Sequence, residues 1–262
     1  MPMMRSAQYT GGTAIRRLRN VALIGLGALI FFPVSPGVSQ EKPAVSQEKK
    51  DAEKKPTTPA VTAAVMPVYK PPLRGAPGGR VGGGTRGTSR EVFVLSVLAP
   101  DHSGLTASEQ PSLYWYISTP TALPVELTVM DPETTQPLLE MRVVAPIEAG
   151  IHRLRLSDHG VRLAPGVAYR WYVAVVPDSG RRSRDILAGG AIQRVNPSGE
   201  MATKLGQARR EELPAVYAEA GLWYDALMAM SELIESAPDD AALRQQRAAL
   251  LTQIGLPLIA ER

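Results

Sequence analysis

The middle of the chain alternates apolar and polar residues with a period of two, which predicts short β-strands. In "PSLYWYI", Leu113, Trp115 and Ile117 fall on one face of a strand, whereas Tyr114 and Tyr116 fall on the other. Pro, Gly and Asp separate the alternating runs, as is typical of turns. The pattern predicts an antiparallel β-sandwich. Its seven strands are expected near 91–98, 111–118, 124–130, 137–144, 150–157, 167–177 and 186–195.

One turn within this region carries a sharper signal. The stretch "LAPGVAY", residues 163–169, resembles the tyrosine corner of immunoglobulin-like and fibronectin type III sandwiches. The resemblance implies that Tyr169 hydrogen-bonds to upstream backbone and that Trp115 fills the core. The expected fold class is therefore mainly β with α: an immunoglobulin/fibronectin III-like sandwich followed by a small helical hairpin.

Towards the C-terminus the apolar spacing changes to three and four residues, which predicts three helices over residues 204–256. Gly221 separates the first two helices, Pro238 precedes the third, and Pro214 bends or begins the first. The spacing resembles a tetratricopeptide repeat at Leu213, Tyr217, Gly221, Ala226, Met230, Leu233 and Pro238. Since one repeat cannot bury its own apolar face, the helices are expected to pack on the sandwich or on a partner.

The N-terminal residues 1–39 have the pattern of a secretory signal peptide. Arginines without acids precede the apolar run "VALIGLGALIFF", and small residues follow it. Cleavage is expected near residues 37–40, which makes the protein periplasmic or secreted. The alternative is an uncleaved membrane anchor, but a span needs about 20 apolar residues, and Pro33 ends this run early. The twin arginines leave the export route open.

Residues 40–89 are rich in Pro, Gly and Lys, and the near-duplicate "VSQEKPA" and "VSQEKKD" begins at residue 38, which predicts a disordered linker. Within it, "GGGTRG" at 82–87 has the glycine spacing of a dinucleotide site. Such a site needs a preceding strand and a following helix, and neither is expected, so no cofactor is predicted. The expected domains are a signal peptide (1–39), a linker (40–89), a β-sandwich (90–198) and a TPR-like helical segment (199–262).

Composition narrows the function further. The chain has no cysteine, which excludes disulfides, a thiol nucleophile and cysteine-based zinc sites. The formal net charge is +4, but removal of the four leader arginines leaves 25 basic and 25 acidic residues. Export and the lack of a basic helix argue against nucleic acid as a partner. The membrane is expected to be contacted only through the signal peptide.

Two sets of polar residues could carry chemistry. His152, Asp158 and His159 could together bind a metal, but they lack a known ligand spacing, so no metal site is predicted. Acidic loop residues could serve a hydrolase of envelope polysaccharide or peptide if two of them faced each other across a cleft. These acids are Glu109, Asp131, Glu133, Asp178 and Asp185. This hydrolase is the alternative function, and no catalytic residue is assigned.

The loop "DSGRRSRD" is a candidate anion-binding site. Arg181, Arg182 and Arg184 could together bind phosphate, sulfate or acidic sugar, which would make the protein an anionic glycan-binding module. Asp178 and Asp185 flank the loop and could neutralise it instead. A solvated hairpin is the favoured interpretation.

The segment "GLWYDALMAM" supplies the candidate partner surface. Trp223, Tyr224 and Leu227 are more apolar than a small helix pair is expected to hide. They are therefore the candidate partner-binding residues. The alternative is that they pack against the sandwich as core.

Several stretches in order resemble the bacterial family of domain of unknown function 928 (DUF928): "RGAPGGRVGGGTR", "SGLTASEQPSLYWYI", "LAPGVAYRWYVAVV", "GGAIQRV" and "AGLWYDALMAM". The resemblance implies no activity, cofactor or catalytic residue. We therefore expect an exported, non-enzymatic protein-interaction module of the cell envelope with an envelope or secreted protein as partner.

Overall fold

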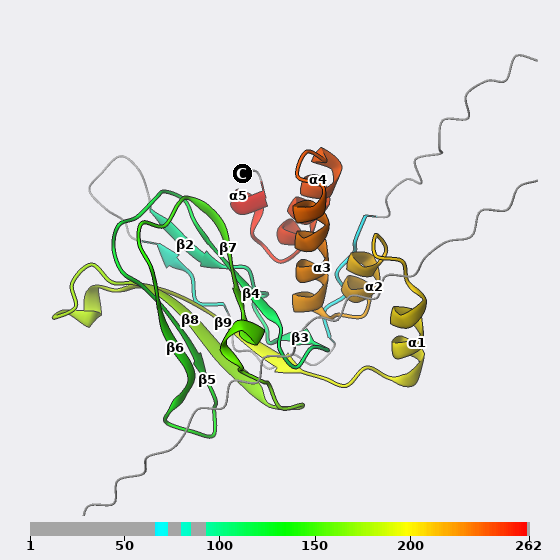
Figure 1. Ribbon diagram of the computed structural model, residues 1–262, viewed down its shortest axis with the longest axis horizontal. Helices are drawn as coiled ribbons and strands as arrows, with labels where there is room; N and C mark the ends of the chain where they lie inside the picture. Colours follow the sequence, from blue (N-terminus) through cyan, green and yellow to red (C-terminus); the bar gives the residue numbers. More distant parts are fainter. Residues whose placement is uncertain (1–65, 73–79, 85–92, 261–262) are drawn as a thin grey trace, which may run out of the picture. The chain divides into compact units, whose positions relative to one another are not determined.

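The computed structural model describes residues 66–72, 80–84 and 93–260. All of them lie within one compact unit, Pro59–Arg262. They form two β-sheets followed by a group of C-terminal helices (Figure 1). The predicted signal peptide and the greater part of the predicted linker lie outside the described residues.

The first sheet has four strands in the order β1-β2-β4-β7. The strands are β1 (Gly83–Gly84), β2 (Val94–Val97), β4 (Ser112–Ile117) and β7 (Gly150–Arg155), and all neighbours are antiparallel. Every residue of β4 is buried, because one of its faces packs in the sandwich and the other lies beneath the helices. β7 forms an edge of this sheet.

The second sheet has five strands in the order β3-β9-β8-β5-β6. They are β3 (Gly104–Thr106), β9 (Ile186–Arg194), β8 (Ala168–Val175), β5 (Val125–Met130) and β6 (Pro137–Val143). Alternate residues of β5 and β8 are buried, as expected for strands that turn one face to a core. The buried residues of both sheets belong to one hydrophobic cluster, which confirms the predicted β-sandwich.

All seven predicted strands are present. Two further strands, β1 and β3, and the parallel direction of one strand pairing were not predicted. β1 and β3 are two and three residues long and contain glycine, so they show no alternation to detect. β3 pairs with β9 in parallel, whereas the sequence predicted an antiparallel sandwich throughout. A three-residue strand can join a sheet edge in either direction, since no hairpin fixes its orientation.

The predicted tyrosine hydrogen bond is present. The Tyr169 hydroxyl accepts a hydrogen bond of 3.0 Å from the Ala164 backbone N–H, five residues upstream. Tyr169 itself is buried at the start of β8. The contact ties the loop before β8 to the sandwich.

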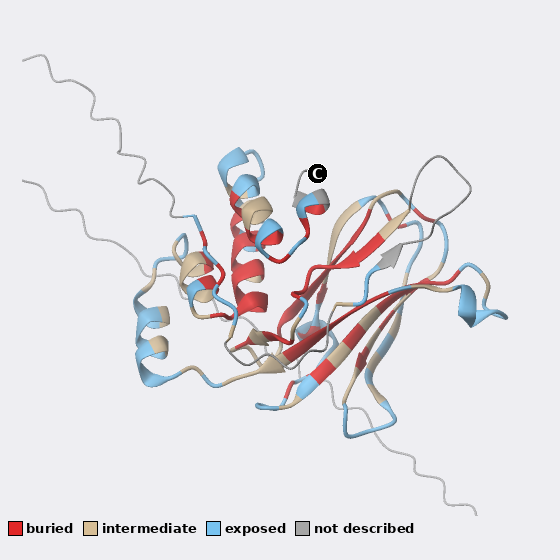
Figure 2. Cartoon of the chain, turned by 180° about the vertical axis from the view of Figure 1, so that it is seen from behind, coloured by how far each residue is buried: buried red, intermediate tan, exposed pale blue. Residues whose placement is uncertain are grey.

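Five helices follow the sandwich, where three were predicted. They are α1 (Gly199–Gln207), α2 (Leu213–Glu219), α3 (Trp223–Ser236), α4 (Ala241–Gln253) and α5 (Pro257–Ala260). Pro214 lies in the first turn of α2, so it begins a helix and divides what the sequence presented as one. α3 is buried over most of its length, whereas α1 is largely exposed (Figure 2). Among the described residues, the helices are too short or too polar to cross a membrane.

Part of the predicted linker is ordered, which corrects the boundary at residue 89. Residues 66–72 run along the helices, where the Lys70 N–H donates to the Ala218 carbonyl and the Tyr69 N–H donates to Gln253. Gly221 permits this approach, since its φ is +75° and a Cβ there would lie 2.8 Å from the Lys70 carbonyl oxygen. Val81 forms a bridge with Gly189 of β9. The low apolar content of the surrounding stretch concealed these contacts.

Candidate functional site

The predicted partner-binding residues are not at the surface. Trp223, Tyr224 and Leu227 are all fully buried at the start of α3. The Trp223 indole N–H donates to the Leu98 carbonyl at 2.9 Å. The structure therefore supports the alternative, that these side chains are core against the sandwich, and the partner surface predicted there is wrong.

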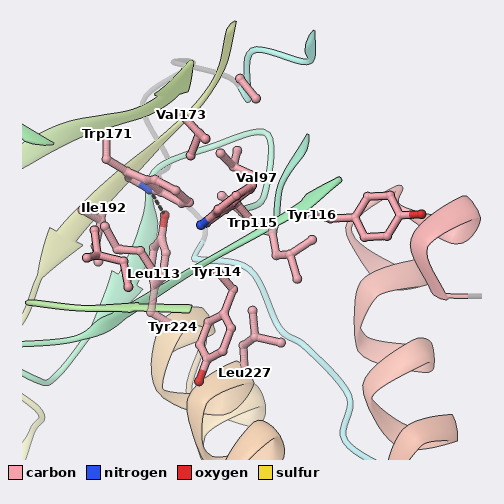
Figure 3. Packing of buried hydrophobic residues seen from close by; sticks show 14 of the residues in the cluster. Val97, Leu113, Tyr114, Trp115, Tyr116, Trp171, Val173, Ile192, Tyr224 and Leu227 are labelled. Carbon is pink, nitrogen blue, oxygen red and sulfur yellow. Dashed lines mark hydrogen bonds between the residues drawn. The ribbon is translucent and has the colours of Figure 1, made fainter. Parts of the chain in front are cut away.

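Tyr224 explains why this helix start is buried. Its hydroxyl accepts a hydrogen bond from the Trp171 indole N–H at 2.9 Å and donates one to the Ala191 carbonyl at 3.0 Å. Figure 3 shows Tyr224 reaching from its helix to Trp171 within the sandwich. Gly104 makes room for the ring, since a Cβ there would lie 2.7 Å from it. The first turn of α3 thus closes one end of the sandwich.

The predicted arginine loop forms a short 3-10 helix, Arg182–Arg184, and is largely exposed. Arg182 lies 2.6 Å from Glu126 and 2.9 Å from Asp185, and Arg181 lies 3.8 Å from Asp178. Hydrogen bonding to Arg182 is the main cause that lowers the pKa of Glu126. Two of the three arginines are thus paired with acids, as the solvated-hairpin interpretation requires.

The histidines do not assemble into a metal site among the described residues. His152 stacks on Trp115 with ring centroids 4.4 Å apart, and its Nε2 lies 2.8 Å from the Glu148 carbonyl oxygen. His102 shares a hydrogen bond of 2.9 Å with the Tyr69 hydroxyl, and burial lowers its pKa. These two rings serve packing, and His159 is exposed at the end of the 3-10 helix Leu156–His159.

Four of the five candidate loop acids have structural partners. Asp131 and Asp178 each accept a backbone N–H within their own turns, at Glu133 and Gly180. Asp185 binds Arg182, as described above. Glu109 pairs with Arg162 and lies 3.7 Å from Arg194.

Glu109 and Asp185 cannot act as a pair of catalytic acids. Asp185 precedes β9, whereas Arg194, the neighbour of Glu109, ends that nine-residue strand. A strand of this length spans about 30 Å, and glycosidase acids lie within about 10 Å of each other.

A buried acid escaped the sequence analysis. Asp225 lies in the first turn of α3, is 3% exposed, and accepts a hydrogen bond of 2.9 Å from the Ala107 N–H. Burial raises its pKa to about 6, against hydrogen bonds that lower it. From the sequence, Asp225 is an acid near the N-terminus of a helix, which is a common position for an acid. The sequence does not indicate that the loop after β3 covers it. Asp225 ties α3 to the loop after β3.

The structure contains a cleft that the sequence did not indicate. It lies between the first sheet and the C-terminal helices and has a volume of about 730 Å³. One wall is formed by the ends of β4 and β7 and the residues next to them, and the other by α4 and α5. The lining residues are Tyr116, Ser118, Ala149, Gly150, Ile151, Ala241, Arg244, Gln245, Arg247, Ala248, Leu251 and Ile259.

The floor of the cleft is apolar and its helical wall is basic. Tyr116 points from β4 towards the C-terminal helices (Figure 3) and is 5% exposed. Arg244 is exposed and donates to the Pro238 carbonyl. Arg247 is half-buried, and its side chain has no hydrogen bond or ion pair within the described part of the chain.

The charge of Arg247 is uncompensated. Burial is the main cause that lowers the pKa of its guanidinium; the nearby Tyr114 raises this pKa, and the positive charge of Arg244 lowers it. The carboxylate of Glu235 acts in the opposite direction, but it is held 2.9 Å from Arg153. A half-buried guanidinium stays protonated near neutral pH. It therefore gives the cleft a positive charge that an anion could neutralise.

Comparison with known proteins gives one result. The family model described as Domain of Unknown Function (DUF928) matches residues 81–262. The match covers both sheets and all five helices, including every residue that lines the cleft. No curated protein matches the chain.

Proposed function

Since the chain belongs to the DUF928 family, a domain of unknown function, we propose its function from the geometry of the cleft. The protein is an exported, non-enzymatic binding module of the bacterial cell envelope. It binds an envelope or secreted protein in the cleft between β7 and α4. This replaces the surface at the start of α3 as the docking site.

The unpaired charge of Arg247 carries this proposal. A protein gains little from a half-buried cation without a partner, because partial desolvation costs free energy that no contact offsets. A cavity of about 730 Å³ lies beside it. Apolar walls with a few convergent polar groups are typical of binding sites. The cleft is therefore better suited to a partner than the paired arginine loop.

Export is supported by the basic and apolar pattern of residues 1–39. If the leader is cleaved, N-terminal sequencing of protein recovered from the envelope of the expressing cells will give a new terminus between residues 37 and 40. Recovery of an intact terminus would instead favour the membrane anchor.

A binding role is preferred over hydrolysis because the candidate acids serve as turn caps and ion-pair partners. We also propose that the sandwich is related to immunoglobulin and fibronectin III domains through the Tyr169 corner. Likewise, α2 and α3 are proposed to be related to a tetratricopeptide repeat. Neither relationship is needed for the docking proposal.

Site-specific photocrosslinking tests the docking site. A photoreactive residue replaces Gln245, which is exposed on the cleft wall, and in a matched chain it replaces the exposed Arg184. We expect a discrete product from position 245 that disappears when Arg247→Gln is added, and none of the same mass from position 184. The same product from both positions, or none from 245, contradicts the proposal.

A further inference from the structure

We propose that the cleft binds an extended acidic peptide segment, which adds to the first sheet as a strand along the edge of β7. This deepens the proposed function and rests on it, since it names the chemistry of the partner at the same cleft. Three features support this mode of binding: the open edge of β7, its continuity with the cleft, and the charge of the cleft.

The open edge follows from the sheet order and register. β7 pairs with β4 on one side and has no neighbour on the other. The Leu156 N–H donates to the Pro111 carbonyl, so residues 150, 152 and 154 direct their backbone groups to β4 by antiparallel alternation. Ile151, Arg153 and Arg155 then direct their N–H and C=O groups away from β4. In the described ranges no backbone hydrogen bond to these three is present.

The cleft continues from this edge. Gly150 and Ile151 belong both to β7 and to the lining of the cleft. Ile151 lies opposite Tyr116 in the register, so its side chain shares the face that looks towards the helices. A strand added beside β7 would therefore place alternate side chains towards α4. Peptides bind other sheet edges in this manner, with backbone hydrogen bonds for affinity and pockets for alternate side chains.

The charge of the cleft selects acidic side chains. Arg244 and Arg247 lie one turn apart on α4 and both line the cleft. A guanidinium binds a carboxylate through two parallel hydrogen bonds. Tyr116, Leu251 and Ile259 provide apolar contact nearby. Since residues two apart on a strand share a face, the ligand would carry an acidic residue and an apolar residue at positions i and i+2.

Binding of labelled peptides to the purified full-length chain tests this inference by fluorescence anisotropy. The probe is an eight-residue threonine-rich peptide with one glutamate and one valine two positions apart. The first control peptide carries glutamine in place of glutamate. The second carries the glutamate and valine at adjacent positions, which places them on opposite faces. The third has proline between them, which removes a backbone donor.

We expect the probe to bind and each control peptide to bind at least about tenfold more weakly, as the loss of a charge-assisted or backbone hydrogen bond predicts. Arg247→Gln should weaken binding of the probe by a similar factor and Arg247→Lys by a smaller one. Arg184→Ala should leave binding of the probe unchanged. Unchanged thermal unfolding of each variant shows that it is folded.

Each other outcome overturns the inference. If the glutamine peptide binds as tightly as the probe, charge does not select the ligand. If the proline peptide binds as tightly as the probe, the ligand does not bind by strand addition. Absence of binding removes both. If position 245 still gives an Arg247-dependent crosslink while the probe does not bind, the docking site stands and its ligand has another chemistry. If both fail, the proposed function fails as well.

Discussion

α3 and α4 both cover the outer face of β4, yet they meet the sandwich in opposite ways. α3 inserts Trp223 and Tyr224 into the interior, where each makes hydrogen bonds to the sheets or their connections. α4 leaves a cleft over Tyr116 with the unpaired Arg247 on its wall. One helix completes the core and the other borders an open cleft.

The difference shows which observation carries the proposed binding surface. The aromatic residues of α3 looked like an interface because a helix pair cannot hide them, but the sandwich can. The basic residues of α4 gave no signal in the sequence, but the fold places them around a cavity that β7 and α5 also line. The unpaired charge beside the cavity therefore supports the proposed site, whereas the aromatic residues of α3 belong to the core.

The largest effect is expected in α3. Trp223→Ala should lower the free energy of unfolding by about 3–5 kcal/mol, because it leaves a cavity and an unpaired Leu98 carbonyl in the core. Gln245→Ala on α4 is the matched change and should alter stability by less than about 0.5 kcal/mol. Urea denaturation measures both. Similar losses for the two variants would abolish the distinction between the helices.

The burial of Asp225 at the start of α3 should make the stability of the protein depend on pH. Its pKa of about 6 lies about two units above that of an unfolded aspartate, so the folded state binds its proton more tightly. Its contribution to stability is therefore fully present below about pH 4, declines as pH rises, and is lost above about pH 6. The decline should total about 3 kcal/mol relative to Asp225→Asn.

Urea denaturation of both proteins from pH 4 to pH 7 measures this decline. If the difference in free energy of unfolding between wild type and the Asp225→Asn variant is constant across that range, burial does not raise the pKa of Asp225.

Strand β4 and the start of α3 show how far the sequence could predict the structure. Alternation placed Leu113 and Trp115 on one face of β4, and the seven strands followed. The contact of Tyr224 with Trp171 could not be inferred, since it joins residues far apart in the chain through a close approach at Gly104. The cleft was missed for the same reason, because its walls come from β4, β7, α4 and α5.

Unlike the substitutions in α3, substitution of Arg247 is expected to affect binding and not stability. Arg247→Gln removes an unpaired charge from a half-buried position, so stability should stay equal or rise by less than about 1 kcal/mol. Binding at the cleft should nevertheless be lost. Thermal unfolding and the photocrosslink from position 245 can be measured on the same protein. A marked loss of stability would identify Arg247 as a structural residue.

The smallest effect is expected in the arginine loop. Arg182→Ala breaks ion pairs with Glu126 and Asp185, in which the guanidinium is exposed and the two carboxylates are largely buried, and pairs near the surface contribute little to stability. The unfolding midpoint should therefore fall only slightly, and the crosslink from position 245 should remain unchanged. Retention on an acidic polysaccharide column that depends on Arg181, Arg182 and Arg184 would return the anion-binding role to this loop.

Hydrogen exchange at the edge of β7 tests the central claim most directly. The backbone amides of Ile151 and Arg153 point away from β4, so in the free protein they should exchange faster than those of His152 and Leu154. Saturation with the acidic probe peptide should slow exchange at Ile151 and Arg153 and leave the arginine loop unaffected. Slow exchange at these two amides in the free protein, or no change with bound peptide, would contradict the account.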